Sequence, residues 1–280
     1  MTKIITFLDG SDYTRSVLDH TAWVAEKTGA SVDVVHVIGR RQSDTPMDWS
    51  GSLELGVRSN LLHELAEHDA QKSRLAQERG KLIVDAGVQH LAAAGVSQAK
   101  ARLLRGDIVE VLKDIEADAD LIVLGKRGEA ADFARMHLGS NLERVARVSS
   151  KPVMVASRAF KPVNAFMIAY DGGASADKAV DHIAKGKLFP GTPCHLVIAG
   201  SDTEQARSRL ENANRKLTAA GFETHASLIP GDAEKVIAEY VKANDIGLLV
   251  MGAYGHSRIR NFIIGSTTTE MIRSVLIPVM

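Results

Sequence analysis

The sequence predicts an α/β fold in which two parallel sheets, each flanked by helices, follow one another along the chain. Three observations lead to this prediction. The chain has 280 residues, a length typical of about two domains. Short apolar runs alternate with amphipathic stretches of helical length, which is the pattern of parallel α/β sheets. The same order of elements occurs twice, once in each half of the chain.

In the first half, predicted strands and helices alternate from the beginning. Apolar runs predict strands at 4–8, 32–38, 101–104 and 121–124, and the segment 152–155 closes the unit. A helical pattern over 13–27 stops at Gly29, a residue suited to the end of a helix. Further helices are predicted over 108–117 and from Ser140, which has capping-box spacing with Glu143.

The second half repeats this order. Strands are predicted at 166–170, 194–199, 226–229 and 248–251, and the segment 278–280 ends the chain. Helices are predicted over 176–185, 206–220 and 236–243. A last helix is expected near Thr267, which has capping-box spacing with Glu270.

Residue offsets between the halves support a duplication. Matched positions near the start of each half are 162 residues apart, and later ones are 125 or 126 apart; the pairs are Asp9 with Asp171, Gly29 with Gly191, Gly106 with Gly231, Gly139 with Gly265, and Pro152 with Pro278. One change of offset requires one extra segment, which falls at about 40–80. Because Lys161-Pro162 reads as a linker, we predict domains at 1–158 and 163–280.

Composition narrows the classes of protein. Lys plus Arg and Asp plus Glu both number 34, and this balance argues against nucleic acid as the main partner. The single cysteine, Cys194, fits a reducing compartment, and its place in a predicted strand favours a buried apolar role over a nucleophilic one. The chain shows neither a signal peptide nor an apolar run of membrane-spanning length, so we expect a cytoplasmic protein without a membrane partner.

The segment after the strand at 248–251 carries the strongest functional signal. Gly252 and Gly255 follow the strand, and Gly265, Ser266 and Thr267 come where the next helix begins. Glycines allow close approach to the backbone, and a helix N-terminus with small hydroxyls favours phosphate. Two glycines alone more often shape a turn, but the full Gly-x2-Gly-x9-Gly-Ser spacing is far more specific.

That spacing resembles the ATP-binding signature of the universal stress protein family. The resemblance also rests on Asp-Gly after the first strand of each half, Gly-Asp after the third, and Pro-Val at the end of each half. It implies doubly wound five-stranded sheets of strand order 3-2-1-4-5, with ATP between strands one and four. It also implies pairing of fifth strands across a dimer, here within one polypeptide as a pseudo-dimer, with a homodimer left open.

The resemblance assigns individual residues to an ATP site in the second half. Asp171 matches the aspartate near the adenosine, Ala199 lies where backbone atoms meet adenine, and Gly231 matches the glycine near the ribose. The residues matching the end of the strand and the phosphate cradle are Met251, Gly252, Gly255, Gly265, Ser266 and Thr267. The expected ligand is ATP, alone or with Mg²⁺.

The first half departs from this pattern. Gly128 and Gly139 enclose ten residues rather than nine, and two of them, Glu129 and Asp132, are acidic. A carboxylate beside a triphosphate is repelled unless a cation lies between them. We therefore expect the second half to hold the ATP site, and the first to be degenerate or to hold another ligand.

The extra segment contains a long charged helix beginning near Leu61. Its His63 and His68 are five residues apart, roughly 140° around a helix, whereas the zinc-protease motif needs a spacing of four. A solvated or domain-packing helix is the default interpretation.

Three functional classes remain at this point. The first is an ATP-binding regulatory or stress-resistance protein that acts through conformation or an unknown protein partner. The second is a slow ATPase, although no general base, nucleophile pair or metal cluster is evident. The third is an interaction module without nucleotide. A dinucleotide oxidoreductase is disfavoured, because Gly-x-Gly-x-x-Gly follows the first strand of neither half.

Overall fold

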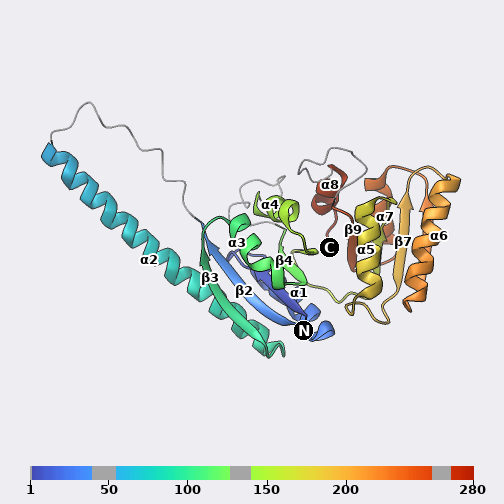
Figure 1. The fold of residues 1–280 in the computed structure, drawn as a ribbon, viewed down its shortest axis with the longest axis horizontal. Helices are drawn as coiled ribbons and strands as arrows, with labels where there is room; N and C mark the ends of the chain where they lie inside the picture. The colour runs from blue at the N-terminus through green and yellow to red at the C-terminus, as the bar shows by residue number, and fades with distance from the viewer. Residues whose placement is uncertain (1, 40–54, 127–139, 254–265) are drawn as a thin grey trace.

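The computed structural model describes residues 2–39, 55–126, 140–253 and 266–280, and it contains two parallel sheets (Figure 1). The first sheet has the order β3-β2-β1-β4-β5, with every neighbouring pair parallel. Its strands are β1 (Lys3–Phe7), β2 (Ser31–Ile38), β3 (Ala99–Arg105), β4 (Leu121–Gly125) and β5 (Val153–Ala156). The predicted strand order 3-2-1-4-5 is confirmed for this half.

The second sheet has the order β8-β7-β6-β9, again all parallel, which matches the first four positions of the same topology. Its strands are β6 (Phe166–Ala169), β7 (Cys194–Ala199), β8 (Thr224–Ile229) and β9 (Leu248–Met251). The fifth position is occupied by an isolated parallel bridge between Val279 and Leu249 rather than by a full strand. Pro278 brings no N–H to this position, so only Val279 and Met280 donate backbone hydrogen bonds there.

Each sheet has helices on both faces. Helices α1 (Thr14–Thr28) and α2 (Leu55–Ala93) pack together on one face of the first sheet, and α3 (Ile108–Ile115) and α4 (Ser140–Val148) on the other. In the second half the corresponding pairs are α5 (Ala174–Lys185) with α6 (Glu204–Ala219), and α7 (Ala233–Ala243) with α8 (Ser266–Ser274). The direction of chain winding thus reverses after β3 and after β8, as a doubly wound fold requires.

Alternate residues of the strands enter two different apolar clusters. Ile4 and Val34 join the cluster beneath α1 and α2, whereas Ile5 and Val35 join the cluster beneath α3 and α4. This is the two-residue period of a strand buried on both faces. Each cluster contains residues from both halves of the chain, so the two sheets share continuous packing.

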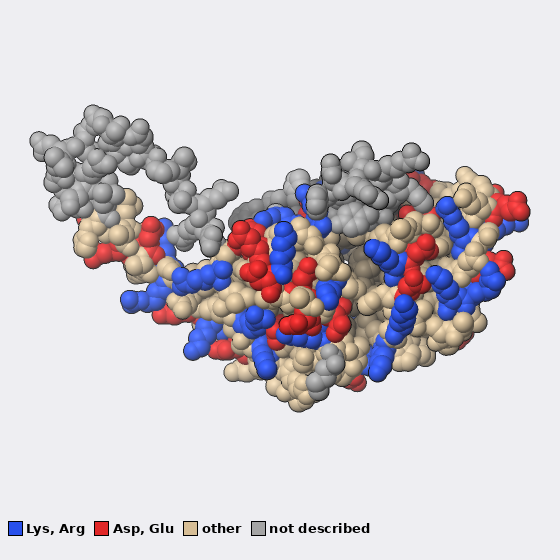
Figure 2. Space-filling view, viewed as in Figure 1, with Lys and Arg blue, Asp and Glu red and all other residues tan. Residues whose placement is uncertain are grey.

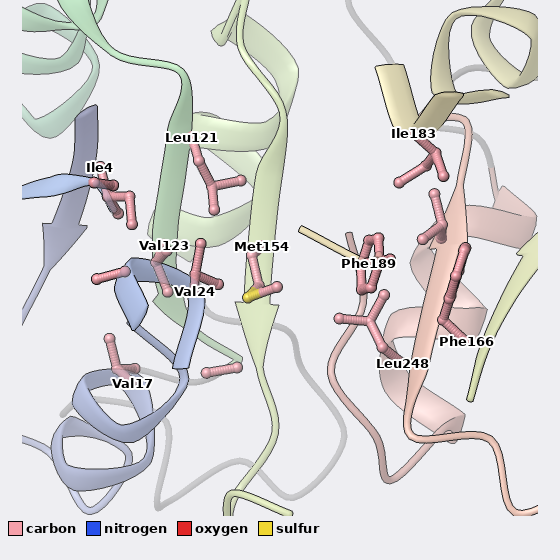
Figure 3. Packing of buried hydrophobic residues seen from close by; sticks show 14 of the residues in the cluster. Ile4, Val17, Val24, Leu121, Val123, Met154, Phe166, Ile183, Phe189 and Leu248 are labelled. Carbon is pink, nitrogen blue, oxygen red and sulfur yellow. The ribbon is translucent and has the colours of Figure 1, made fainter. Parts of the chain in front are cut away.

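The contact between the halves is formed by β5 and the last residues of the chain. Val155 donates its N–H to the Val279 carbonyl at 2.7 Å, and Val279 donates to the Val155 carbonyl at 3.1 Å, in an antiparallel bridge. Figure 3 shows Met154 of β5 between the first-half core and Phe189 and Leu248 of the second. The implied pairing at the fifth-strand position therefore occurs within one polypeptide, through a bridge of minimal length.

The long charged helix predicted in the extra segment is present as α2. It has 39 residues, whereas its counterpart α6 has 16. Of the described residues, none belongs to a helix that is both long and apolar enough to cross a membrane.

Candidate functional site

The candidate site lies at the carboxyl edge of the second sheet, where β6 and β9 run side by side. Ala169 at the end of β6 pairs with Met251 at the end of β9. Winding reverses between these two strands, and ligands of open α/β sheets bind at such a point. The structure therefore brings Asp171, Met251 and Gly252 to one edge, as the sequence predicted.

Asp171 forms a tight turn between β6 and α5. Its carboxylate Oδ1 accepts a hydrogen bond from the Gly173 N–H at 2.8 Å, and the side chain is exposed at the edge. Asp9 makes the same turn in the first half, accepting from the Ser11 N–H at 3.0 Å. A shared turn at matched positions confirms that the two segments are structural counterparts.

Gly252 lies directly against the N-terminus of α5. A Cβ at this position would come within 2.9 Å of Ser175 Cβ and 3.0 Å of the Ala176 backbone nitrogen. The next residue, Ala253, donates its N–H to Ser175 Oγ at 3.1 Å. A side chain at position 252 would have to displace either the strand end or the helix, so this position requires glycine.

The first turn of α8 holds the same loop from the other side. The Thr268 hydroxyl is buried and lies 3.3 Å from the Gly252 carbonyl and 3.4 Å from the Ala253 carbonyl, to which it donates. Sequence reasoning missed both Ser175 and Thr268. Their position in the sequence could have indicated this role, because each lies in the first turn of a helix that follows a strand of the site.

The ends of β7 and β8 extend the edge away from β6. Ala199 pairs with Ile229, which precedes Pro230 and Gly231. Gly231 has φ 142°, a conformation that favours glycine. Asp232 then caps α7 by accepting from the N–H groups of Glu234 and Lys235 at 3.2 and 3.3 Å. Ala199 and Gly231 thus lie at the same edge of the sheet as Asp171.

Part of the predicted phosphate cradle cannot be placed. Gly255 and Gly265 lie outside the described residues. Ser266 and Thr267 begin α8, as predicted, but nothing is described of their side chains. In the first half, Glu129 and Asp132 also fall outside the described residues.

The first-half edge repeats the second up to Lys126. Gly106 has φ 141°, and Asp107 caps α3 by accepting from the Val109 N–H at 2.9 Å. Arg144 of α4 donates to Asp107 at 2.6 Å, and this hydrogen bond lowers the pKa of the Asp107 carboxyl. The equivalent capping residue in the second half, Asp232, accepts from the backbone N–H groups of Glu234 and Lys235.

Lys126 crosses from the first half to the second. Its ammonium group donates to the carbonyl oxygens of Arg273 at 3.2 Å and Val275 at 2.8 Å. These carbonyls belong to the C-terminal end of α8, where a cation is favourable. Helix α8 therefore contacts the Gly252 loop through its N-terminal turn and the first half of the chain through its C-terminal end.

A metal-binding cluster and a reactive thiol are both absent from the described residues. No group of three or more His, Cys, Asp or Glu side chains able to hold a metal ion occurs among them. Cys194 is buried, and burial raises the pKa of its thiol to about 12, so the thiolate is scarce at neutral pH.

Comparisons with known proteins agree with this architecture. The model of the universal stress protein family matches residues 1–157 and 195–280. Universal stress protein Slr1230 of Synechocystis sp. is 37% identical over 284 residues, covering 100% of this chain and 99% of its own. Universal stress protein YxiE of Bacillus subtilis is 27% identical over 155 residues, which is 97% of its length but 55% of this chain.

A solved structure shows the same overall fold. The universal stress protein from Archaeoglobus fulgidus superposes with a TM-score of 0.68 at 22% identity, covering 99% of this chain and 94% of that one. The family match extends into both halves, and the halves share the order of their first four strands, the turn after the first strand and the capped helix after the third. The chain therefore belongs to the universal stress protein family, in its tandem two-domain form.

Proposed function

We propose that the second half binds ATP at the edge between β6 and β9 and that the protein acts in regulation or stress resistance through nucleotide-dependent conformation. The observation that carries this proposal is the close packing of the Gly252 backbone against the first turns of α5 and α8. Two helix N-termini and a backbone without a Cβ converge on one loop, which is the environment that phosphate groups prefer.

The proposed roles follow from position along the edge. Asp171 presents an exposed carboxylate after β6, which can accept hydrogen bonds from ribose hydroxyls. Ala199 and Gly231 offer backbone at the ends of β7 and β8 for the base and sugar. We assign the phosphates to the loop from Gly252 to the start of α8, including Gly255, Gly265, Ser266 and Thr267, with Mg²⁺ as a companion ion.

A regulatory role is supported by the connection from this loop to the first half. Helix α8 contacts the Gly252 loop through Thr268, and its C-terminal carbonyls accept from Lys126. Just beyond α8, Val279 bridges to β5. Any nucleotide-linked shift of α8 would therefore reach the first half directly.

The proposal is tested with Gly252→Val. The added side chain collides with backbone of α5, so we expect ATP affinity, measured by isothermal titration calorimetry, to fall at least about tenfold, or about 1.4 kcal/mol. Gly125→Val is the matched change in the first half and should have a smaller effect. Thermal unfolding of each variant checks that the fold is retained.

Ser175→Ala supplies a second variant that leaves the backbone space unchanged. It removes one hydrogen bond to the loop, so ATP should bind more weakly than in the wild type but better than in Gly252→Val. Normal ATP binding by a folded Gly252→Val protein would disprove the assignment. A larger loss in Gly125→Val than in Gly252→Val would place the working site in the first half.

A further inference from the structure

Helix α2 extends far beyond the sheet that it covers. Its 39 residues span about 58 Å, whereas β3 beside it spans about 23 Å. The first buried residue of the described part of α2 is Gly80, and residues 63–71 are all exposed. Figure 1 shows the N-terminal part of α2 reaching well away from both sheets. A helix gains most of its stability from packing, so this projecting part lacks its usual support.

Among the residues of this helix whose side chains the structure describes, three leucines are exposed. Leu65 is 49% exposed, Leu75 57% and Leu82 70%. Counted in heptads, Leu65 occupies an a position, and Leu75 and Leu82 occupy successive d positions, which together form one seam. The interleaved seam residues His68, Lys72 and Arg79 are polar, and such residues fix register at some cost in stability.

Charge divides this helix into two blocks. The stretch 63–70 contains three acids, Glu64, Glu67 and Asp69, and neither lysine nor arginine. The stretch 71–82 contains one acid, Glu78, and four cations, Lys72, Arg74, Arg79 and Lys81. Figure 2 shows acidic side chains nearer the free end of α2 and basic ones following them toward the body. Parallel pairing of two such helices would align like charges, whereas antiparallel pairing aligns opposite ones.

We propose that the projecting part of α2 is a dimerisation surface, which pairs antiparallel with α2 of a second copy of this chain. In the register that places Leu65 opposite Leu75 of the second copy, Glu67 and Asp69 lie within a turn of its Arg74 and Lys72. A two-fold axis repeats each contact, so the Leu65–Leu75 contact and the pairing of the two charge blocks each occur twice. The acidic block disfavours nucleic acid as the occupant, and the dense charge on both sides disfavours a membrane.

This surface is separate from the fifth-strand contact. The edge of β5 is already paired with Val279 inside the chain, and that pairing does not involve α2. The new interface is also independent of the proposed nucleotide site, because α2 belongs to the first half and the site to the second.

The first test measures the mass of the full-length protein by sedimentation equilibrium over a range of concentrations. We expect a monomer–dimer equilibrium that weakens in high salt, because the paired charge blocks are exposed. Leu65→Glu with Leu75→Glu should raise the dissociation constant at least tenfold. Leu276→Glu is the matched control, since Leu276 is 90% exposed but lies after α8, and it should change nothing.

A charge exchange distinguishes antiparallel self-pairing from other occupants. One variant carries Glu64→Lys, Glu67→Lys and Asp69→Lys, and another carries Lys72→Glu, Arg74→Glu and Lys81→Glu. Each should be monomeric alone, and a mixture of the two should form a heterodimer, because both contacts in the mixed pair join opposite charges.

Three results would overturn the proposal. One is a wild-type monomer at every concentration. Another is a dimer unaffected by the double leucine change, which would place the contact elsewhere. The third is a mixture of charge variants that stays monomeric, which would exclude antiparallel pairing.

Discussion

His20 of α1 is fully buried at the boundary between the two halves. Its Nδ1 lies 2.6 Å from the Ser16 carbonyl and therefore donates to it, so the neutral ring carries its proton on Nδ1. Its Nε2 has no hydrogen-bond partner among the described residues, and the ring packs perpendicular to that of Phe160, with the ring centroids 5.1 Å apart. Burial lowers the pKa of His20 below its ordinary value of 6.5.

This burial makes the stability of the protein depend on pH. As pH falls below 6.5, the unfolded chain binds a proton at His20 before the folded chain does, so the free energy of unfolding decreases. We expect the urea midpoint to be lower at pH 5.5 than at pH 7.5. Burial also lowers the pKa values of His182 and His195, so they add to the same trend.

The variant His20→Phe measures how much of this pH dependence of stability comes from His20. This variant should lose less stability between pH 7.5 and 5.5 than the wild type, whereas His63→Gln, at an exposed position of α2, should lose as much. An unchanged pH dependence in His20→Phe would show that other groups dominate.

At the candidate site, the sequence predicted the residues that are placed by their position in the chain, just after a strand. Gly252 follows β9 directly and Asp171 follows β6 after one residue, so the order of the sequence alone places both at the carboxyl edge. Ser175 and Thr268 could not be predicted in the same way. Their contacts with the Gly252 loop depend on how closely two separate helices approach it, which is a long-range property of packing.

At the scale of elements, α2 lies close on the first sheet because of two glycines. A Cβ at Gly80 would come within 2.6 Å of Leu103 Cδ1, and one at Gly87 within 2.8 Å of Leu8 Cδ1 and 2.9 Å of Val34 Cγ1. The two glycines are seven residues apart and therefore lie on the same face of the helix. That face is the one that packs against β2 and β3.

Gly87→Leu should destabilise the first half by about 1–3 kcal/mol, because the new side chain overpacks a filled core. Urea unfolding measures this loss. Ala86→Leu adds the same side chain at the neighbouring exposed position and should change stability by less than about 0.5 kcal/mol. Equal losses in the two variants would contradict close packing at Gly87.

The order of elements could be predicted because each strand and helix carries its own pattern. The offset between the halves also predicted where α2 would be longer than its counterpart. The projection of α2 beyond the sheet was not predicted, since its heptad pattern does not reveal where contact with β3 ends. The sequence also did not predict that the fifth strand of the second sheet is replaced by an isolated bridge at Val279, because Pro278-Val279-Met280 has the same sequence pattern as a strand.

For the whole molecule, the two halves behave as one packed body. Trp23 of α1 approaches Phe189 of the second half, with ring centroids 6.0 Å apart, and both apolar clusters continue across the contact. Lys126 joins the halves at the end of α8. Resemblance to the family predicted a contact at the fifth strand. The contact made by Lys126 could not be predicted, because its partners are backbone carbonyls, which carry no sequence signal.

Val279 is the residue through which the two sheets are hydrogen-bonded. It exchanges two backbone bonds with Val155, and neighbouring Met280 donates to Leu249 at 2.8 Å. Val279→Pro removes the N–H that binds Val155, at a cost of about 1 kcal/mol for the bond alone. The proline ring also restricts the residue before it to extended conformations.

We therefore expect Val279→Pro to separate the unfolding of the halves. In wild type, amide exchange measured by mass spectrometry should protect β4 and β9 to a similar free energy of opening, since they belong to one cooperative body. In Val279→Pro, β9 should exchange faster than β4. Val279→Ala keeps both backbone bonds, so it should lower protection of the two strands together. Equal protection of β4 and β9 in the proline variant would show that the shared apolar clusters, and not the Val155–Val279 bridge, couple the halves.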